Sequence, residues 1–377
     1  MRILYLQRKI ATSFAFFRYQ HHGYMVTSNF AYSEIHFWGE MLMTVAQMIC
    51  ERERTYLSQF ACLSENTKGR EQLTVPCTTR TEFQRDRDRI IHCKAFRRLM
   101  HKTQVFLSPE DDHYRTRLTH TLEVAQIART IARGLFLNED LTEAAALGHD
   151  LGHTPFGHAG ELVLQECYSP DFTHYRQSLR VVDKLENNGL GLNLTYEVRD
   201  GILNHAGNDR ADTLEGRIIK FADRIAYINH DIDDAIRGRV LRFDDIPADI
   251  TELLGRTHSE RIGTLVNDII VNSTGKDDIL MTPEIGSAMM ELREFLFSKV
   301  YRNPEAKGEE ARAKDMLRRM YEYFVKHPEK IPAEERNAYG EKDSVERRVC
   351  DYIAGMTDRY AINVFENLFI PKIWKVN

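Results

Sequence analysis

Apolar residues recur at helical spacing along most of this chain. After Thr119, Val124, Ile127 and Ile131 follow His120 at intervals of four, seven and eleven residues, which predicts an amphipathic helix. The stretch 215–236 repeats the pattern more strongly, with isoleucines flanking a polar stripe. No segment shows convincing strand alternation over any length, and no repeat period is visible. The pattern predicts an all-α fold.

The 377 residues allow one large or two modest domains. Residues 1–42 differ from the rest because they are rich in aromatic side chains and poor in charge. No apolar run there approaches the ~20 residues that span a bilayer, so we expect no membrane association. We interpret residues 1–42 as an atypical N-terminal extension or a misassigned start, and residues 43–377 as the functional region.

The composition, 42% hydrophobic and 28% charged, is that of an ordinary globular protein. A net charge of −5 excludes a global attraction to nucleic acid, so local arginine and lysine side chains would have to meet an anionic substrate. The six cysteines show no Cys-x-x-Cys spacing, which is typical of free thiols in a reducing cytosol. We therefore expect a cytoplasmic protein.

The densest candidate chemistry lies between His149 and Glu161, where thirteen residues hold three histidines and two carboxylates. Imidazole and carboxylate groups together are typical ligands of a divalent metal. His149 and His153 are spaced to share one helical face, and His158 and Glu161 to share another. Thr154-Pro155 and Gly157 should break the helix between them. One half of the motif could then hold a metal while the other faces a substrate.

Two other predicted helices offer partners for this motif. His120 lies with the apolar face of its helix, where a purely structural buried histidine is an equally good interpretation. Arg117, one turn earlier, is well placed for a phosphate. On the helix over 215–236, Asp223, Tyr227 and Asp231 are spaced by four residues. A polar stripe on so apolar a helix indicates a pocket lining, with Asp223 as the ligand candidate.

The order His120, His149-Asp150, Asp223 resembles the HD superfamily of metal-dependent phosphohydrolases, which are all-helical. Longer strings resemble the deoxyguanosinetriphosphate triphosphohydrolase (dGTPase) family within it, over roughly Thr78 to Pro371. The resemblance implies an HD core at about 115–240 and a helical C-terminal region at about 248–377. The strings that carry it are Phe96–Leu99, Lys102–Phe106, Arg115–Val124, His149–His158 and Asp351–Asp358.

The resemblance implies hydrolysis of dGTP, with other dNTPs as further candidates, to a deoxynucleoside and inorganic triphosphate. It also implies a homo-oligomer, and it leaves room for an allosteric dNTP and for weak binding of single-stranded DNA. The cofactor would be a divalent metal (Mg, Mn, Fe, Co, Ni or Zn). The implied site comprises metal ligands His120, His149, Asp150 and Asp223; a catalytic dyad, His158 and Glu161; phosphate-side residues Arg117, His153, His174 and Arg224; and sugar-side residues Gln104, Tyr227 and Asp231.

Two alternatives stay open at this point. The first is an HD-domain 5′-nucleotidase that acts on deoxynucleoside monophosphates, since such a site needs fewer arginines. The second is a nucleotide-sensing regulator with a vestigial site, against which the complete ligand set and dyad argue. Guanosine-tetraphosphate hydrolases would show Glu-Asp shortly after the His-Asp pair, where this chain has Leu151-Gly152-His153. Cyclic-dinucleotide phosphodiesterases would carry a Gly-Tyr-Pro signature, which this sequence lacks.

Overall fold

The computed structural model describes residues 43–104, 115–301, 304–338 and 343–372. The chain divides into two units after Thr44, and all helices below belong to the unit Val45–Asn377. The all-α prediction is confirmed: within these ranges the only β-type pairings are two isolated bridges, Arg70 with Thr195 and Thr103 with Thr116. The interpretation of residues 1–42, and the end of the Lys102–Phe106 string, fall outside the described residues.

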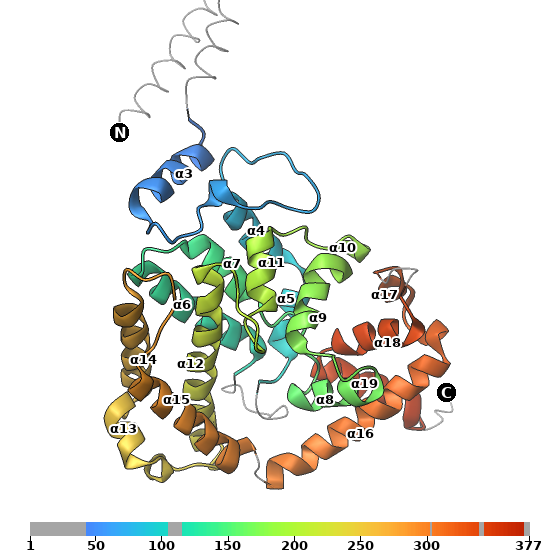
Figure 1. Cartoon of the computed structure of the whole chain (residues 1–377). Helices are drawn as coiled ribbons and strands as arrows, with labels where there is room; N and C mark the ends of the chain where they lie inside the picture. The colour runs from blue at the N-terminus through green and yellow to red at the C-terminus, as the bar shows by residue number, and fades with distance from the viewer. Residues whose placement is uncertain (1–42, 105–114, 302–303, 339–342, 373–377) are drawn as a thin grey trace, which may run out of the picture. The chain divides into compact units, whose positions relative to one another are not determined.

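The described elements of Val45–Asn377 are helices joined by loops, and a long loop connects η1 to α4 (Figure 1). None of those described is long and apolar enough to cross a membrane. The N-terminal part contains α3 (Val45–Tyr56), η1 (Ser64–Asn66), α4 (Glu82–His92), α5 (Lys94–Arg98), η2 (Leu99–His101), α6 (Arg117–Gly134) and α7 (Glu139–Gly148). The middle part contains α8 (His158–Cys167), α9 (His174–Arg180), η3 (Val181–Leu185), α10 (Glu186–Gly189), α11 (Tyr196–Leu203) and α12 (Leu214–Arg237).

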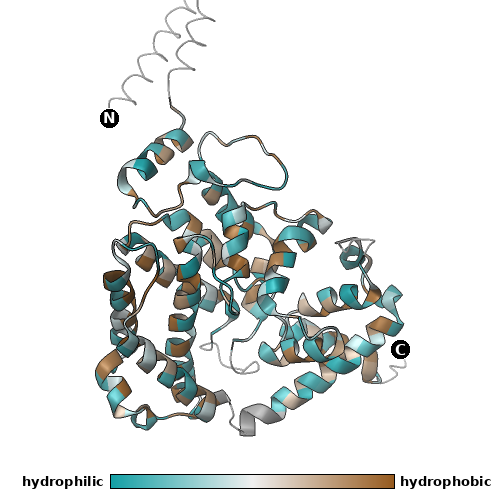
Figure 2. Ribbon diagram, in the orientation of Figure 1, coloured by the Kyte–Doolittle hydropathy of each residue, from teal (hydrophilic) through white to brown (hydrophobic). Residues whose placement is uncertain are grey.

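The remaining elements form the C-terminal part. They are η4 (Phe243–Asp245), α13 (Ala248–Leu254), α14 (His258–Ser273), α15 (Pro283–Leu296), η5 (Phe297–Tyr301), α16 (Pro304–Lys326), η6 (Pro328–Lys330), α17 (Ala333–Ala338), α18 (Val345–Ala354) and α19 (Asp358–Phe369). Most helices carry both hydrophobic and hydrophilic segments in Figure 2, as amphipathic helices do.

Local sequence explains where the helices that carry the site begin. Thr116 caps α6 by accepting a hydrogen bond from the backbone N–H of Thr119. Asn138, whose residue type followed by Glu139 and Asp140 predicts a helix cap, does cap α7 and accepts from the N–H groups of Asp140 and Leu141. Thr213 caps α12 in the same way. These caps satisfy amide groups that have no partner inside the helix, so they fix the first turn of each helix.

The described side chains form two hydrophobic clusters. The main core joins α4 to α7 with α11 to α15, and all isoleucines of α12 except Ile236 are buried in it. The second core joins α8 to α16, α18 and α19, with Phe156, Leu164 and Leu317 among its members. The segment from His149 to His158 runs from the last turn of α7, in the first core, to the start of α8, in the second. The candidate site therefore lies where the two cores meet.

Two details of the sequence interpretation are wrong. Val345, Val349, Ile353 and Met356 recur at helical spacing and predict a last long helix from Asp343, but the helix observed there, α18, ends at Ala354, and α19 follows after Gly355–Thr357. Thr357 provides the cap that starts α19, because its side chain accepts from the N–H of Tyr360. The polar composition of the stretch Lys307–Lys314 predicts a hinge, but the stretch lies within α16. Its charged residues belong to a long helix rather than to a linker.

Candidate metal and catalytic site

Four predicted ligands converge from three helices. His120 lies on α6, His149 directly follows α7, Asp150 comes next, and Asp223 lies on α12. The Nε2 atom of His120 is 3.1 Å from Oδ1 of Asp223, and Nε2 of His149 is 3.7 Å from Oδ1 of Asp150. Histidine and carboxylate atoms bind a divalent metal at about 2.0–2.2 Å, so two ligands of one ion lie roughly 3–4 Å apart. These separations fit a single ion.

The hydrogen bonds of the two histidines also suit metal binding. Nδ1 of His149 lies 2.6 Å from the carbonyl of Ala146, to which it donates, and its buried Nε2 has no hydrogen-bond partner among the described residues. Nδ1 of His120 lies 2.8 Å from Nε2 of His230. If His120 donates this bond when a metal is present, its Nε2 offers the metal a lone pair; without a metal, Nε2 can instead donate to Oδ1 of Asp223. An outer hydrogen bond of this kind fixes the tautomer of a metal-binding imidazole.

Both carboxylates of this quartet are held in the ionised form. Burial disfavours the charge of Asp150, but the neighbouring His149 and Arg117 outweigh burial and keep the pKa of Asp150 well below its usual range. Arg117, itself buried, donates from Nη1 to Oδ2 of Asp150 at 2.7 Å. The pKa of Asp223 is also lowered, because the hydrogen bond and charge of His120 outweigh burial. Ionised carboxylates are the form that binds a metal.

A second group of imidazoles is organised around Glu161 on α8. Its Oε2 lies 3.0 Å from Nδ1 of His158, while its Oε1 lies 3.1 Å from Nδ1 of His174 and accepts the backbone N–H of His174 at 2.8 Å. These bonds outweigh burial and hold the pKa of Glu161 far below its ordinary value. Burial disfavours the cation of His174, yet Glu161 raises the pKa of His174 above its usual value. Glu161 is thus a fixed anion that orients two imidazoles.

The two groups are contiguous. His153 stacks on His174 with ring centroids 4.7 Å apart, and ligand-type atoms of Asp150, His153 and His174 all lie within 4.8 Å of one another. Ser178 on α9 links the groups further, since it donates to the carbonyl of His149 and accepts the N–H of Gly152. Any side chain at Gly152 would collide with the backbone of Ser178. The segment after α7 and helix α9 therefore hold each other in place.

The sequence interpretation contains one error here. His149 and His153 do not share a helical face, because α7 ends at Gly148 and the chain then turns. The turn brings Asp150 to the metal side and stacks His153 on His174. The expected break at Thr154–Gly157 and the i, i+3 pair His158 and Glu161 on one helix are both observed.

The predicted sugar and phosphate residues lie around these groups. Gln104 is partly buried, and its Oε1 has no partner within the described ranges. Arg224 on α12 is partly exposed and contacts the sulfur of Met290. Tyr227, one turn further along α12, accepts a 2.9 Å hydrogen bond from Nε of Arg293. Asp231 is buried, with Oδ1 2.7 Å from Nδ1 of His230. Their contacts with a substrate stay predictions.

Three residues that sequence reasoning did not single out also belong to this region. His230 makes a hydrogen bond with Nδ1 of His120, and Arg293 donates a hydrogen bond to the hydroxyl of Tyr227. His205, at the end of α11, is buried against His149 and His174, with ring centroids 4.9 and 5.4 Å away. The only signal in the sequence was the concentration of histidines between His113 and His230. That signal could not distinguish His205 and His230 from histidines that serve packing alone.

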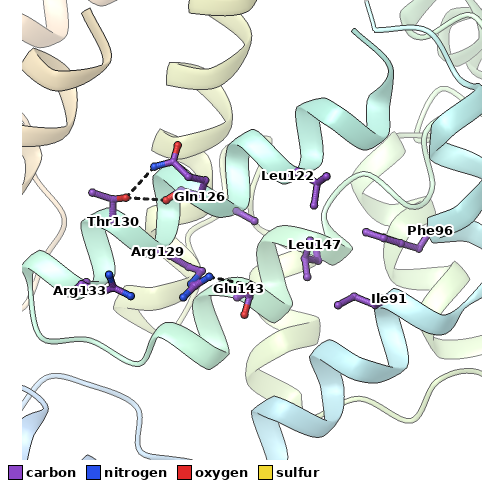
Figure 3. A pocket seen from close by; sticks show the side chains of 10 residues that line it. Ile91, Phe96, Leu122, Gln126, Arg129, Thr130, Arg133, Glu143 and Leu147 are labelled. Atoms are coloured by element: carbon purple, nitrogen blue, oxygen red, sulfur yellow. Dashed lines mark hydrogen bonds and ion pairs between the residues drawn. The ribbon is translucent and has the colours of Figure 1, made fainter. Parts of the chain in front are cut away.

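A hollow of about 560 Å³ lies away from this site (Figure 3). It is bordered by α4, α6 and α7, and by Phe96 of α5. Its lining mixes apolar side chains such as Leu122 with the paired charges of Arg129 and Glu143. No candidate metal ligand or dyad residue lines it. Size alone therefore does not locate the chemistry in this protein.

Comparison with known families agrees with the fold and the ligand pattern. Residues 117–228 match the family described as HD domain, and residues 279–367 match the family described as phosphohydrolase-associated domain. The first range contains all four members of the quartet, and the second contains most of α15 to α19. The fold and these matches are those of an HD-domain phosphohydrolase.

This chain matches nearly the whole length of several curated relatives. A protein from Caldanaerobacter subterraneus subsp. tengcongensis is 56% identical, over 88% of this chain and 98% of its own. Proteins from Desulfatibacillum aliphaticivorans and Clostridium perfringens are 50% and 49% identical, each over 99% of the relative and 87% and 88% of this chain. All three are named deoxyguanosinetriphosphate triphosphohydrolase-like protein. The chain belongs to this deoxyguanosinetriphosphate triphosphohydrolase-like family.

Proposed function

We propose that this protein is a metal-dependent dNTP triphosphohydrolase, which cleaves dGTP and other dNTPs to a deoxynucleoside and inorganic triphosphate. The observation that carries the proposal is the contiguity of two groups of different chemistry. One is a quartet suited to a divalent metal, in which His120, His149 and Asp150 are buried and Asp223 is partly exposed, and the other is a pair of imidazoles held by an ionised Glu161. The first suits a phosphoryl oxygen, and the second suits the transfer of a proton. The names of the relatives support the same reaction.

His120, His149, Asp150 and Asp223 would hold the metal. When bound, a divalent ion would polarise a phosphoryl oxygen and favour the ionisation of water, which is the chemistry that metals supply to phosphate hydrolysis. Arg117 has two roles in this proposal. It anchors Asp150 through Nη1, and its remaining N–H groups are donors for a phosphate. His153 would face the same phosphates, since it lies between Asp150 and His174.

His158 is the proposed proton donor. Glu161 binds its Nδ1, so its Nε2 is available to the substrate, and its side chain is 77% exposed. In the reaction, the oxygen of water joins the α-phosphorus and the bond from that phosphorus to the 5′-oxygen breaks. The departing 5′-oxygen takes its proton from His158, while the proton that the attacking water loses passes to solvent, from which His158 recovers its own. A positioned general acid of this kind contributes about 10²–10⁴-fold to a rate.

The other predicted contacts define the substrate class. Arg117 and Arg224 are cations for a triphosphate, and Gln104, Tyr227 and Asp231 are proposed to hold the deoxyribose. Tyr227 cannot move freely, because Arg293 fixes its hydroxyl. A fixed phenol ring close to the 2′ carbon would leave no room to solvate a 2′-hydroxyl. This is our physical reason to expect deoxynucleotides rather than ribonucleotides.

The test is a product analysis with the purified full chain. After metal removal by a chelator, each divalent metal is restored in turn, and dGTP, the other dNTPs, GTP and dGMP are supplied as substrates. Phosphorus NMR distinguishes triphosphate, pyrophosphate and orthophosphate. We expect triphosphate from dGTP. In water enriched with oxygen-18, the label should appear in the triphosphate and not in the deoxynucleoside, because water attacks phosphorus.

Other products would select the alternatives. Orthophosphate released from dGMP, with no triphosphate from any dNTP, would identify a 5′-nucleotidase. Nucleotide binding without turnover in the presence of every metal would identify a regulator. Label in the deoxynucleoside would mean that the carbon–oxygen bond breaks, and the proposed role of the dyad would be wrong.

A further inference from the structure

The Asp351–Asp358 segment has no role in the reaction as described so far, although it lies against the site. It comprises the end of α18, the turn Gly355–Thr357 and the first residue of α19. Asp351 and Asp358 are both buried. Asp351 accepts hydrogen bonds from Gln177 and Arg180, which flank Ser178 at the end of the helix that begins with His174. A buried carboxylate needs such partners, so these contacts are specific rather than incidental.

Asp358 joins two separate walls of the site. Its Oδ2 accepts the backbone N–H of Thr103 at 2.9 Å and the hydroxyl of Thr103 at 2.6 Å. Its Oδ1 accepts the backbone N–H of Phe156 at 2.9 Å. Thr103 precedes Gln104, a proposed sugar contact, and Phe156 lies two residues before His158. One side chain of the C-terminal region therefore fixes the backbone next to both functional residues.

The hydrogen bond of Asp358 to the backbone N–H of Phe156 matters most, because the backbone of Phe156 has an unusual conformation. Phe156 has φ 59°, a left-handed conformation that is costly for a bulky residue, and Gly157 follows with φ 59°. Such conformations persist only where surrounding contacts enforce them. This turn aims α8, which starts at His158. A Cβ on Gly157 would lie 3.3 Å from Nη2 of Arg117 and 3.7 Å from the Gln104 carbonyl, so the turn packs against the substrate side.

Lys102 adds two hydrogen bonds between the same segments of the chain. Its side chain is buried, and its ammonium group donates to the carbonyl of His153 and, at 2.9 Å, to the carbonyl of Ala354. The contact with His153 ties the start of the turn to the segment that carries Gln104. The contact with Ala354 ties both to the end of α18. Three pieces of chain therefore meet through Lys102 and Asp358.

We propose that Asp358 is a positioning residue for the reaction: it enforces the Phe156–Gly157 turn and so holds His158 against the substrate, with Thr103 and Gln104 as the opposite wall. This inference rests on the proposed function. It assigns to the C-terminal region a share in building the site, beyond packing. A misplacement of about 1 Å can reduce a rate by about 10²-fold, so loss of this hold should be visible in kcat.

The first test compares Asp358→Asn with Asp86→Asn. Asp86 is a matched control because it is buried and accepts the N–H and hydroxyl of Thr195 at 2.8 and 2.7 Å, the same pattern that Asp358 makes with Thr103. It also pairs with Arg70, so its loss should disturb the fold at least as much. An asparagine has one acceptor oxygen and would turn its NH₂ group toward an N–H or hydroxyl donor.

Two readouts are needed, and the first does not depend on activity. Hydrogen exchange should accelerate at the amides of Thr103 and Phe156 in Asp358→Asn and stay slow there in Asp86→Asn. The second is kinetic: kcat for dGTP should fall about 10- to 100-fold in Asp358→Asn, with metal content unchanged and a smaller change in KM. Asp86→Asn should stay within about threefold of the wild type.

A second pair of substitutions, milder than the first, tests the proposal if Asp358→Asn does not fold. Thr103→Val and Thr195→Val each remove one hydroxyl that donates to a buried aspartate, at matched distances of 2.6 and 2.7 Å. Only Thr103→Val should lower kcat. Equal kinetic losses in both members of a pair, or unchanged exchange at Phe156 in Asp358→Asn, would overturn the positioning role. If the wild type cleaves no dNTP, the proposed function fails, while the exchange result still decides whether Asp358 holds the turn.

Discussion

The two halves of the site are built in different ways. The metal quartet comes from α6, the end of α7 and α12, which pack together in the main core, and its histidines are 1% exposed or less. The dyad half depends on a turn, on the start of α8 and on contacts with the C-terminal region, and its His158 is largely exposed. Helices of the main core therefore position most of the quartet, with Asp150 held in a turn by Arg117, whereas the dyad depends chiefly on individual hydrogen bonds.

This difference predicts different sensitivities. Packing of many apolar side chains should protect the geometry of the quartet, so only the loss of a ligand itself should damage it strongly. The dyad has no such redundancy, and the loss of one remote hydrogen bond can move it. Substitutions in the two halves should thus separate metal binding from turnover, and the following experiments test that separation.

The largest effect is expected from Asp223→Ala. The substitution removes a carboxylate from the quartet, so bound metal and activity should be lost together, with activity falling below detection. Helical content by circular dichroism should stay unchanged, because the buried isoleucines still anchor α12. Metal content is measured by atomic emission on the purified protein. Full metal occupancy in this variant would remove Asp223 from the ligand set.

His158→Ala should lower turnover without loss of metal, in contrast to Asp223→Ala. The variant should keep its metal and its affinity for a nonhydrolysable dNTP analogue, because His158 lies outside the quartet. Turnover should fall by about 10²–10⁴-fold, the usual contribution of a positioned acid or base. Single-turnover kinetics and equilibrium binding measure the two properties separately. A near-normal kcat would refute the dyad, and a loss of metal would contradict the independence of the two halves.

Tyr227→Ala tests the proposed contact with the sugar, which belongs neither to the metal quartet nor to the dyad. Removing the ring should admit a ribose and narrow the preference for dGTP over GTP by roughly tenfold to a hundredfold, equivalent to about 1–3 kcal/mol for an unsolvated hydroxyl. Arg224→Ala serves as the comparison, since it should raise KM for both nucleotides alike. The ratio of kcat/KM for dGTP and GTP gives the answer. An unchanged ratio in Tyr227→Ala would exclude this residue from sugar selection.

The same division explains what the sequence could predict. The helices, the caps at Asn138 and Thr282, and the separate candidates His120 and Asp223 follow from local spacing, whereas the joining of His120, His149, Asp150 and Asp223 into one ligand set is what the family resemblance implies. The resemblance to a known family supplied the pairing of His158 with Glu161 and placed His174 among the phosphate-side residues, whereas the bonds between His174 and Glu161 came only from the structure. Local rules account for the i, i+3 contact of His158 and Glu161 on α8.

Long-range contacts of irregular backbone were not predictable. Nothing in the local sequence shows that Asp358 bonds to Phe156, some 200 positions earlier, or that Phe156 adopts a left-handed conformation. The erroneous helical face of His149 and His153 has the same origin, because the chain leaves the helix at a turn that Ser178 enforces from another helix. The buried ammonium of Lys102 could not be inferred either, since both of its acceptors are backbone carbonyls.

The smallest expected effect concerns the stability of the dyad half as the pH changes. Glu161 has a lowered pKa, so its contribution is present above the unfolded value near 4.5 and is lost as the pH falls through its folded pKa. His174 has a raised pKa, so its contribution is present below 6.5 and is lost as the pH rises through its folded pKa. The bonded pair should therefore stabilise the protein most between roughly pH 4.5 and 6.5.

His174→Gln measures this contribution in chelated protein. Burial lowers the pKa of the neighbouring His205 to about 3 and also lowers that of His153, so neither should titrate across the range from pH 6 to pH 8.5. At pH 6 the variant should be less stable than the wild type by roughly 1.5–3 kcal/mol, the range for a hydrogen bond to a charged group. At pH 8.5 the difference should shrink, because His174 of the wild type loses its proton. Urea unfolding at the two pH values gives both differences, and a difference that grows with pH would contradict the ionic pairing of His174 with Glu161.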